Sequence, residues 1–298
     1  MMFSGFWALQ IFVAKLAFNA GVEVLAFQVL SYSAVLIILA VVLLRQVGSQ
    51  LLDLFRNHGA LFWQLFLANG IQAGLGTFLS MIGIAMTAAI NAGFLVKLAT
   101  VTTILFAWII LNERMTPRKL ATVFVMLFGA YLLTTKGQAL LPRVGDLFIL
   151  GACFCWSLGN VLVRRILRSQ PVNPDVVTMQ KPVAGLLVLL LLVGAVVIFG
   201  ELSGSQSPIF GCCTVSPSYL TYAAATGICL AGAWFYLNRT LKVATASYMT
   251  LMSMVTPVLV GILALFFLGE TLVWIQVIGA ALIIMSGIAI SLRGIAAA

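Results

Sequence analysis

The amino-acid sequence predicts an all-α polytopic membrane protein with ten transmembrane helices in two inverted five-helix repeats. Three observations carry this prediction. The chain of 298 residues is 63% apolar and only 8% charged, its apolar residues fall into ten long runs, and its second half repeats motifs of the first. A soluble domain carries about 25% charged residues. This chain therefore lacks the polar side chains that a surface facing water needs.

Ten segments are long and apolar enough to cross a bilayer, which takes about 20 residues of helix. Clusters of charged or turn-forming residues separate them, at 45–58, 113–117, 136–146, 164–174 and 201–217. The predicted spans are 3–20, 24–44, 60–84, 89–111, 118–136, 145–164, 176–199, 218–237, 243–268 and 272–292.

The basic residues orient these spans. The net charge of +9 comes from 16 Lys and Arg against 7 Asp and Glu. Only Lys136 and Arg143 fall in the loops on one side, eleven fall on the other, and Lys15, Lys97 and Lys181 lie within spans. Because basic loops are retained in the cytoplasm, both termini are predicted to be cytoplasmic. Lys15 and Lys181 are near span ends, so interfacial positions are expected for both.

Two pairs of motifs reveal an internal repeat. The stretch LNERM at 111–115 matches LGETL at 268–272 with an offset of 157 residues. Earlier in each half, FWALQIFVAK at 6–15 resembles CWSLGNVLVR at 155–164 with an offset of 149. The shorter offset predicts an insertion in the Ser/Gly-rich loop at 201–218.

The repeat divides the chain into two predicted units, 1–137 and 138–298. Each unit holds five spans, and an odd number forces the second unit to enter the membrane from the opposite side. Inverted repeats of this kind are typical of secondary transporters, whose substrate site lies near the bilayer midplane between the repeats.

The motifs within these units resemble the EamA-type branch of the drug/metabolite transporter superfamily. The resemblance rests on a Trp in the first span, on AMTAAINAGFLVKL entering the fourth span, and on LNERMTPRKL and FGAYLL after it. The second half repeats this pattern as VATASYMTLMSMVTPVLVGILALFFLGETL. The resemblance to this family implies ten helices, transport of small metabolites, and a location in a bacterial inner membrane or an organelle membrane. It does not imply a particular substrate.

Lys97, inside the fourth span, is the first candidate for substrate binding. An ammonium group in hydrocarbon costs about 3 kcal/mol or more, so such a group normally faces a cavity and has a partner. We expect Lys97 to bind a carboxylate or phosphate of the substrate. Alternatively, its ammonium group bonds to carbonyls at a helix end or snorkels to the membrane interface. A lysine at this position resembles the pattern of the sugar-phosphate branches of the superfamily. Those branches have a Lys-Arg pair in the ninth span, where this chain has Thr256-Pro257. Thr100 stands where the family has a mid-helix proline, the counterpart of Pro257.

Polar and aromatic residues three or four apart form stripes that share a helix face. Amides in a membrane avoid lipid, so these faces should line a cavity or bond to neighbouring helices. The candidates for substrate binding are Trp7, Gln10, Gln72, Asn91, Trp156, Asn160 and Tyr248, and similar stripes hold Gln28, Ser31, Tyr32 and Asn69. Trp7 and Trp156 occupy related positions in the two units and are expected to bracket a ligand. Tyr248, near a span end, is alternatively an interface anchor.

Glu113 and Glu270 are predicted to have a structural role at helix ends. Each follows a central span and precedes a helix start, where a carboxylate can accept backbone N–H bonds and complement the helix dipole. Thr116-Pro117 predicts an N-cap followed by proline at the first helical position. No Cys/His cluster with metal-binding spacing occurs, His58 is the only histidine, and all seven Asp and Glu lie at span ends or in loops. Neither a metal nor a cofactor is therefore expected.

These features favour a secondary transporter that moves a small organic metabolite, an amino acid or related compound, by alternating access in the export direction. The alternative within this class is an organic-anion or sugar-phosphate exchanger that uses Lys97. An intramembrane enzyme would need a nucleophile with a base, or a metal site, and a receptor without transport is a third class. The expected partners are a small-molecule substrate and the lipid bilayer, with no nucleic acid. Gly129, Gly279 and Ser286 permit close helix contacts either within the chain or in a homodimer.

Overall fold

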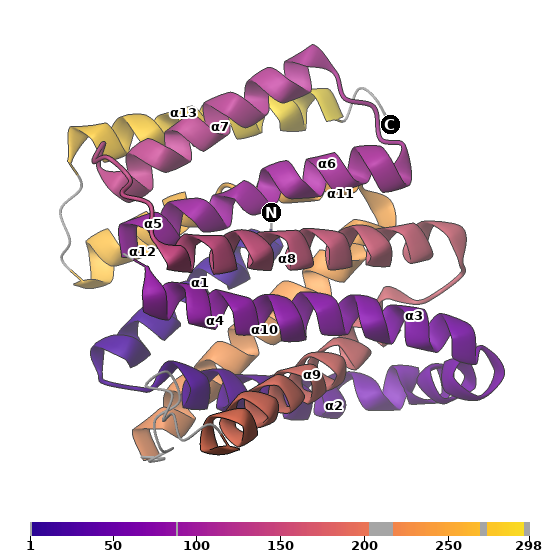
Figure 1. The fold of residues 1–298 in the computed structure, drawn as a ribbon. Helices are drawn as coiled ribbons and strands as arrows, with labels where there is room; N and C mark the ends of the chain where they lie inside the picture. The colour runs from indigo at the N-terminus through magenta and orange to yellow at the C-terminus, as the bar shows by residue number, and fades with distance from the viewer. Residues whose placement is uncertain (1, 88, 203–216, 269–272, 295–298) are drawn as a thin grey trace.

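The computed structural model describes residues 2–87, 89–202, 217–268 and 273–294. Every element in these ranges is helical, and the helices form one bundle (Figure 1). Among the described residues, nine helices are long and apolar enough to cross a membrane, and a shorter apolar helix covers Trp274–Ala289. The predicted fold class, an all-α polytopic membrane protein, is confirmed.

The helices follow the predicted spans in order, although three spans are divided. In chain order the elements are α1 (Met2–Asn19), α2 (Val24–Asn57), α3 (Gly59–Asn69), the π-helical η1 (Gly70–Leu75), α4 (Gly76–Met86), α5 (Ala89–Leu95), the 3-10 segment η2 (Val96–Leu98), α6 (Ala99–Leu111), α7 (Pro117–Thr135), α8 (Val144–Ser169), α9 (Pro174–Leu202), α10 (Pro217–Val243), α11 (Ala246–Ser253), α12 (Thr256–Leu268) and α13 (Trp274–Gly294). The predicted loop at 201–218 lies mostly outside the described residues.

Helix α2 is longer than predicted. The sequence placed its end at residue 44 and a break at 45–58, but the helix continues to Asn57. Val47 and Leu54, spaced seven apart, are buried, and Leu51 between them is partly buried in the same apolar cluster. Because this stretch contains no proline and has an apolar face at helical spacing, the helix persists. Its 34 residues extend about 51 Å, well beyond a hydrocarbon core of about 30 Å.

The third span contains a π-helical segment that lies against α8 and α9. The backbone of η1 approaches α9 closely, since a Cβ added to Gly74 would lie 2.5 Å from Val188 Cβ. On the other side, a Cβ added to Gly159 of α8 would lie 2.5 Å from Gln72 Cβ and 2.7 Å from the Ala68 carbonyl oxygen. Glycine is therefore required at both crossings, which place the polar side chains of η1 in the bundle interior.

The fourth and ninth spans are both broken before or near their midpoints. In the first half η2 separates α5 from α6, and in the second half a turn at Met254–Val255 separates α11 from α12. The starts of α5 and α11, of α6 and α12, and of α7 and α13 are each 157 residues apart. Pro257 accounts for the second break, because it begins a new helix within its first turn. The first break forms without a proline, with Thr100 in the following turn.

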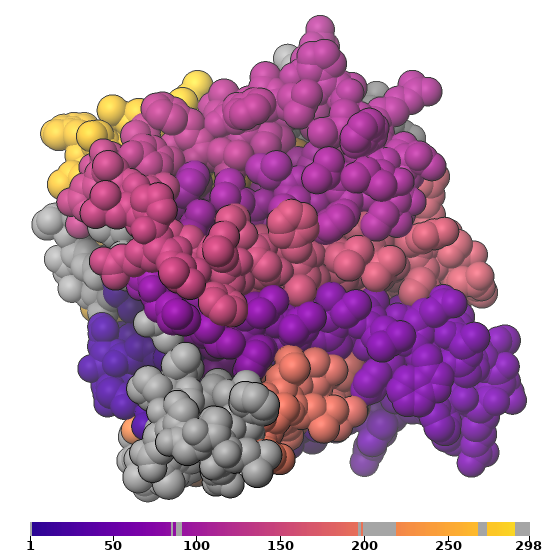
Figure 2. Space-filling view, viewed as in Figure 1, coloured from indigo at the N-terminus to yellow at the C-terminus, as the bar shows by residue number. Residues whose placement is uncertain are grey.

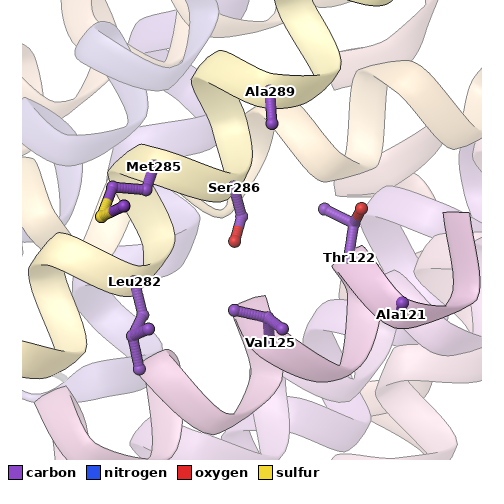
Figure 3. A pocket seen from close by; sticks show the side chains of 7 residues that line it. All are labelled: Ala121, Thr122, Val125, Leu282, Met285, Ser286 and Ala289. Atoms are coloured by element: carbon purple, nitrogen blue, oxygen red, sulfur yellow. The ribbon is translucent and has the colours of Figure 1, made fainter. Parts of the chain in front are cut away.

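Helices α7 and α13 form a pair at one side of the bundle (Figure 1). They cross at Gly129 and Gly279, where a Cβ added to Gly129 would lie 2.7 Å from the Gly279 carbonyl oxygen. These small residues thus serve a contact within the chain. Beyond the crossing the two helices diverge around an open, apolar groove of about 310 Å³ (Figure 3), lined by Ala121, Thr122, Val125, Leu282, Met285, Ser286 and Ala289.

The largest apolar cluster joins residues of α1, α2, α3, η1, α6, α8, α9, α10 and α11. Helix α8 is central to the bundle and packs against α4, α6 and η1. Figure 2 shows a face on which α8 lies between α4 and α6. One end of the bundle, where α6, α8 and α10 finish, is called the basic end; it carries Arg114, Arg118, Lys119, Arg165, Arg168 and Lys242.

Candidate substrate-binding region

Two of the predicted binding residues meet in the bundle interior. Gln72 on η1 donates from Nε2 to Asn160 Oδ1 on α8 at 2.6 Å. Both side chains are buried, and Gln72 Oε1 makes no hydrogen bond with the described residues. An amide buried with one unpaired oxygen is costly in an apolar interior. The pair therefore offers an acceptor in the interior between the two halves of the chain.

A second buried amide pair lies next along the same face of the third span. Asn69 donates to Gln180 Oε1 of α9 at 3.3 Å, and Gln180 Nε2 donates to the Phe62 carbonyl at 3.1 Å. Asn69 is 0% exposed and its Oδ1 has no hydrogen-bond partner among the described residues. The third span thus presents buried amides to both α8 and α9, about one helical turn apart.

Lys181 is the most deeply buried cation of the described chain. Its side chain is 1% exposed, and Nζ lies 5.3 Å from the centre of the Trp234 ring on α10. Tyr32 of α2 contacts the same ring edge-to-face, with the ring centres 5.3 Å apart. The predicted interfacial position of Lys181 is wrong. Helix α9 begins at Pro174, which puts Lys181 about 10 Å inside the helix, and the lysine faces neighbouring helices rather than the helix end.

Lys97 lies in η2, at the break of the fourth span. The thiol of Cys153 on α8 lies against this segment, donating to the Leu95 carbonyl at 3.4 Å. The Lys97 side chain is half-buried and has neither a hydrogen bond nor an ion pair with the residues described. Its role in binding stays a prediction.

The predicted aromatic pair belongs to separate apolar clusters. Trp7 on α1 packs against the largest cluster, whereas Trp156 on α8 packs with Ala92 and its neighbours and lies against the backbone of Gly76. The bracketing of one ligand by both rings stays a prediction. Gln10, one turn after Trp7, is half-buried.

Tyr248 lies in the first turn of α11. Its side chain is half-buried and packs at the margin of the largest apolar cluster. Its backbone N–H donates to Thr245 Oγ1 at 3.1 Å, so the hydroxyl of Thr245 caps this helix. A substrate contact by Tyr248 stays a prediction.

Asn91 connects helices at the end opposite the basic end. Its Nδ2 donates to the Leu141 carbonyl at 2.7 Å and to Asp146 Oδ2 at 3.0 Å. Asp146 also accepts from Thr87 Oγ1 and from the backbone N–H of Arg143, and so caps the first turn of α8. The amide of Asn91 is engaged in this cap; substrate binding by it stays a prediction.

Glu113 reaches across to the second half of the chain. Its carboxylate accepts from the backbone N–H groups of Ala246 at 2.9 Å and Ser247 at 3.2 Å, and from Ser247 Oγ at 2.5 Å. Lys119 Nζ lies 3.8 Å from the same carboxylate. The carboxylate thus caps α11 of the second half, while Thr116 caps α7 by accepting from the Lys119 N–H, with Pro117 at the first helical position as predicted. Glu270 lies outside the described residues.

Two further basic side chains bind helix ends nearby. Arg164 Nη1 donates to the carbonyls of Leu241 at 2.5 Å and Lys242 at 2.7 Å, while Lys242 Nζ donates to the Leu167 carbonyl at 2.7 Å. Cations at the C-termini of helices satisfy orphan carbonyls and the helix dipole. Arg164 and Lys242 therefore join the C-terminal parts of α8 and α10 at the basic end.

Comparisons with known proteins agree with this architecture. The model of the EamA-like transporter family matches residues 1–135 and again residues 143–292. The chain belongs to the EamA-like transporter family. An uncharacterized transporter of Bacillus subtilis (strain 168), YyaM, is 28% identical over 213 residues; the match covers 70% of this chain and 66% of that protein, just under two thirds of its length.

A crystal structure of another protein shows the same fold. It superposes with a TM-score of 0.69 over 98% of this chain and 96% of that chain, at 18% sequence identity. Membership of the EamA-like transporter family, together with the apolar helices, makes the chain an integral, multi-pass membrane protein. No group of three or more His, Cys, Asp or Glu that could hold a metal occurs among the described residues of this EamA-like transporter.

Sequence reasoning missed several residues of the polar interior. Gln180 and Asn238 were not singled out, and Trp234 was passed over although its neighbour in space, Tyr32, lies in a recognised stripe. A signal was present, since Thr178, Lys181 and Gly185 recur at intervals of three and four residues in an otherwise apolar helix. That spacing marks one face of α9 as polar and close-packed.

Proposed function

We propose that this EamA-like transporter moves a small organic metabolite, an amino acid or related compound, out of the cell by alternating access of two inverted five-helix units, residues 1–137 and 138–298. The observation that carries the proposal is the pair of broken helices. Both breaks occur at corresponding positions, and the helices that follow them start 157 residues apart. Discontinuous helices of this kind supply the substrate sites of secondary transporters.

The physical reason lies in the backbone. A helix break within a membrane leaves N–H and C=O groups without intrahelical partners, and these are tolerated only where protein or a water-filled cavity meets them. The two broken helices adjoin, because α11 packs against α6. The hydroxyls of Thr102, Thr103 and Ser157 gather beside the first break, with Thr102 Oγ1 2.6 Å from Ser157 Oγ. Polar groups from both units therefore lie beside the first break.

Counterflow into proteoliposomes tests the proposal. Vesicles with the purified protein are loaded with unlabelled compound and offered labelled amino acids, sugar phosphates or lipophilic cations in separate experiments. Uptake of labelled amino acids above protein-free vesicles supports the proposal. Ligand binding without counterflow of any class would refute transport and favour a receptor.

A sugar-phosphate or other organic-anion exchanger is the second candidate, favoured by Lys97 at the first helix break. A cation placed at a break, with no hydrogen bond to the described residues, is suited to bind an anion. Lys97→Gln, assayed at equal expression, should lower the counterflow of sugar phosphates if they are substrates. Unchanged rate and half-saturation would exclude Lys97 from the site.

We also propose that the protein lies in a bacterial inner membrane with both termini in the cytoplasm. The positive-inside rule supports this orientation, since the basic end then faces the cytoplasm. In a background without native cysteines, Gln138→Cys in the loop after α7 should react with an impermeant maleimide on intact cells. Gln170→Cys, in the loop after α8, should react only after permeabilisation, and the opposite pattern would reverse the topology.

A further inference from the structure

The buried ammonium group of Lys181 forms no ion pair with any residue in the described part of the chain. Its Nζ makes no hydrogen bond with the described residues, although the side chain is 1% exposed. The nearest acidic side chain along α9 is Asp175, six residues earlier. Asp175 is fully engaged by Arg239, which donates from Nε at 3.0 Å and from Nη2 at 2.8 Å. Asp175 therefore does not neutralise Lys181.

Structural lysines of this protein are bonded quite differently. Lys242 also lies among packed helices, yet its Nζ donates to the carbonyls of Leu167 at 2.7 Å and Gln170 at 3.3 Å. A lysine kept only for packing or helix capping would have such partners, because an unpaired buried charge is strongly destabilising. Among the residues described, the Lys181 ammonium interacts with the aromatic ring of Trp234 and with no hydrogen-bond acceptor.

The surroundings of Lys181 combine a cation, aromatic faces and free acceptors. Asn238, one helical turn from Trp234 on α10, donates to Thr178 Oγ1 at 2.9 Å, and its Oδ1 has no hydrogen-bond partner among the described residues. Thr178 is three residues before Lys181 and shares its face of α9. The Asn238 amide therefore lies beside α9 one helical turn before Lys181, and the Trp234 ring that Lys181 contacts lies one turn before Asn238 on α10.

We propose that Lys181 binds the carboxylate of the transported molecule, while Asn238 Oδ1 accepts a hydrogen bond from a donor group on the same molecule. The proposal rests on the proposed transport function and deepens it. A single lysine suits a monoanionic carboxylate. A phosphate is usually held by several cations, a guanidinium fork or a helix N-terminus. The rings of Trp234 and Tyr32 supply an apolar surface for the rest of the ligand.

The test uses the full-length protein in proteoliposomes and in detergent. Counterflow of a mixture of ¹⁴C-labelled amino acids is competed with unlabelled amino acids, with the corresponding amino-acid amides, which lack the carboxylate, and with inorganic phosphate. In the wild type, amino acids should compete at least about tenfold better than their amides, as expected for a lost charge-assisted hydrogen bond. Lys181→Met should remove this preference, and Lys181→Arg should retain part of it. Lys136→Met, in an exposed loop, is the matched control.

Stability measurements separate a binding role from a structural one. Because the ammonium has no hydrogen bond to a described residue and its burial is costly, Lys181→Met should unfold in detergent at the same temperature as the wild type or higher. Amino acids, but not their amides, should raise the unfolding temperature of the wild type and not that of Lys181→Met. Equal competition by amides, or a variant with unchanged preference, refutes the proposal while transport stands. Absence of both counterflow and thermal shift in the wild type refutes the proposed function as well.

Discussion

Replacing Glu113 with alanine should loosen the contact between the two halves of the chain at the basic end. The substitution removes the acceptor of two backbone N–H groups and one hydroxyl in the first turn of α11. Loss of an N-terminal capping acceptor costs about 0.5–2 kcal/mol. Loss of a carboxylate at a helix N-terminus costs about 0.3–1 kcal/mol more. The expected loss of stability is therefore about 1–3 kcal/mol.

Thermal unfolding of the purified protein in detergent measures this loss. At about 2–4 °C per kcal/mol, the unfolding temperature should fall by about 2 to 12 °C. Glu23→Ala is the matched control, because Glu23 also stands at a helix N-terminus, that of α2, but makes no capping hydrogen bond. Equal shifts for Glu113→Ala and Glu23→Ala would refute the reasoning. A further readout is hydrogen exchange, which should quicken in the first turn of α11 in Glu113→Ala alone.

Two other substitutions test the packing and capping described above. Gly159→Ala should destabilise the protein by about 1–3 kcal/mol through overpacking, because its methyl group would meet Gln72 Cβ and the Ala68 carbonyl. Gly5→Ala, with nothing within 4 Å of its added Cβ, should leave the unfolding temperature unchanged or higher, and equal effects of the two would contradict the helix crossing. Asp146→Ala should speed hydrogen exchange in the first turn of α8, as expected for a lost cap worth about 1 kcal/mol; unchanged exchange there would show that the cap is dispensable.

The architecture was predictable because apolar run length and charge placement are local properties of the sequence. The end of α2 was harder to place. A break was inferred from the polar residues after Arg45, yet Val47 and Leu54 keep an apolar face in contact with the core. Whether a polar stretch continues a helix beyond the membrane depends on what its apolar face meets, and this is a tertiary property.

The candidate site was predictable only in part. The amides of Gln72 and Asn160 were identified by spacing, and the structure brings them into contact. Lys181 was misplaced because distance from a helix end does not tell which neighbours surround a side chain. The contact of Glu113 with Ser247 joins residues 134 positions apart. Sequence spacing can predict that a carboxylate caps a helix, but not which helix comes within its reach.

The crossing of α7 and α13 limits how the two halves of this transporter can move. The two helices come from different halves and touch through glycine backbones, with no side chain between them at Gly129 and Gly279. Such a contact permits rotation about the crossing point but resists sliding, because any shift drives a neighbouring side chain into the opposing carbonyl. If the halves rock as proposed, this point is the pivot. Spin labels flanking it should then keep a constant separation while labels at the two ends of the bundle change theirs.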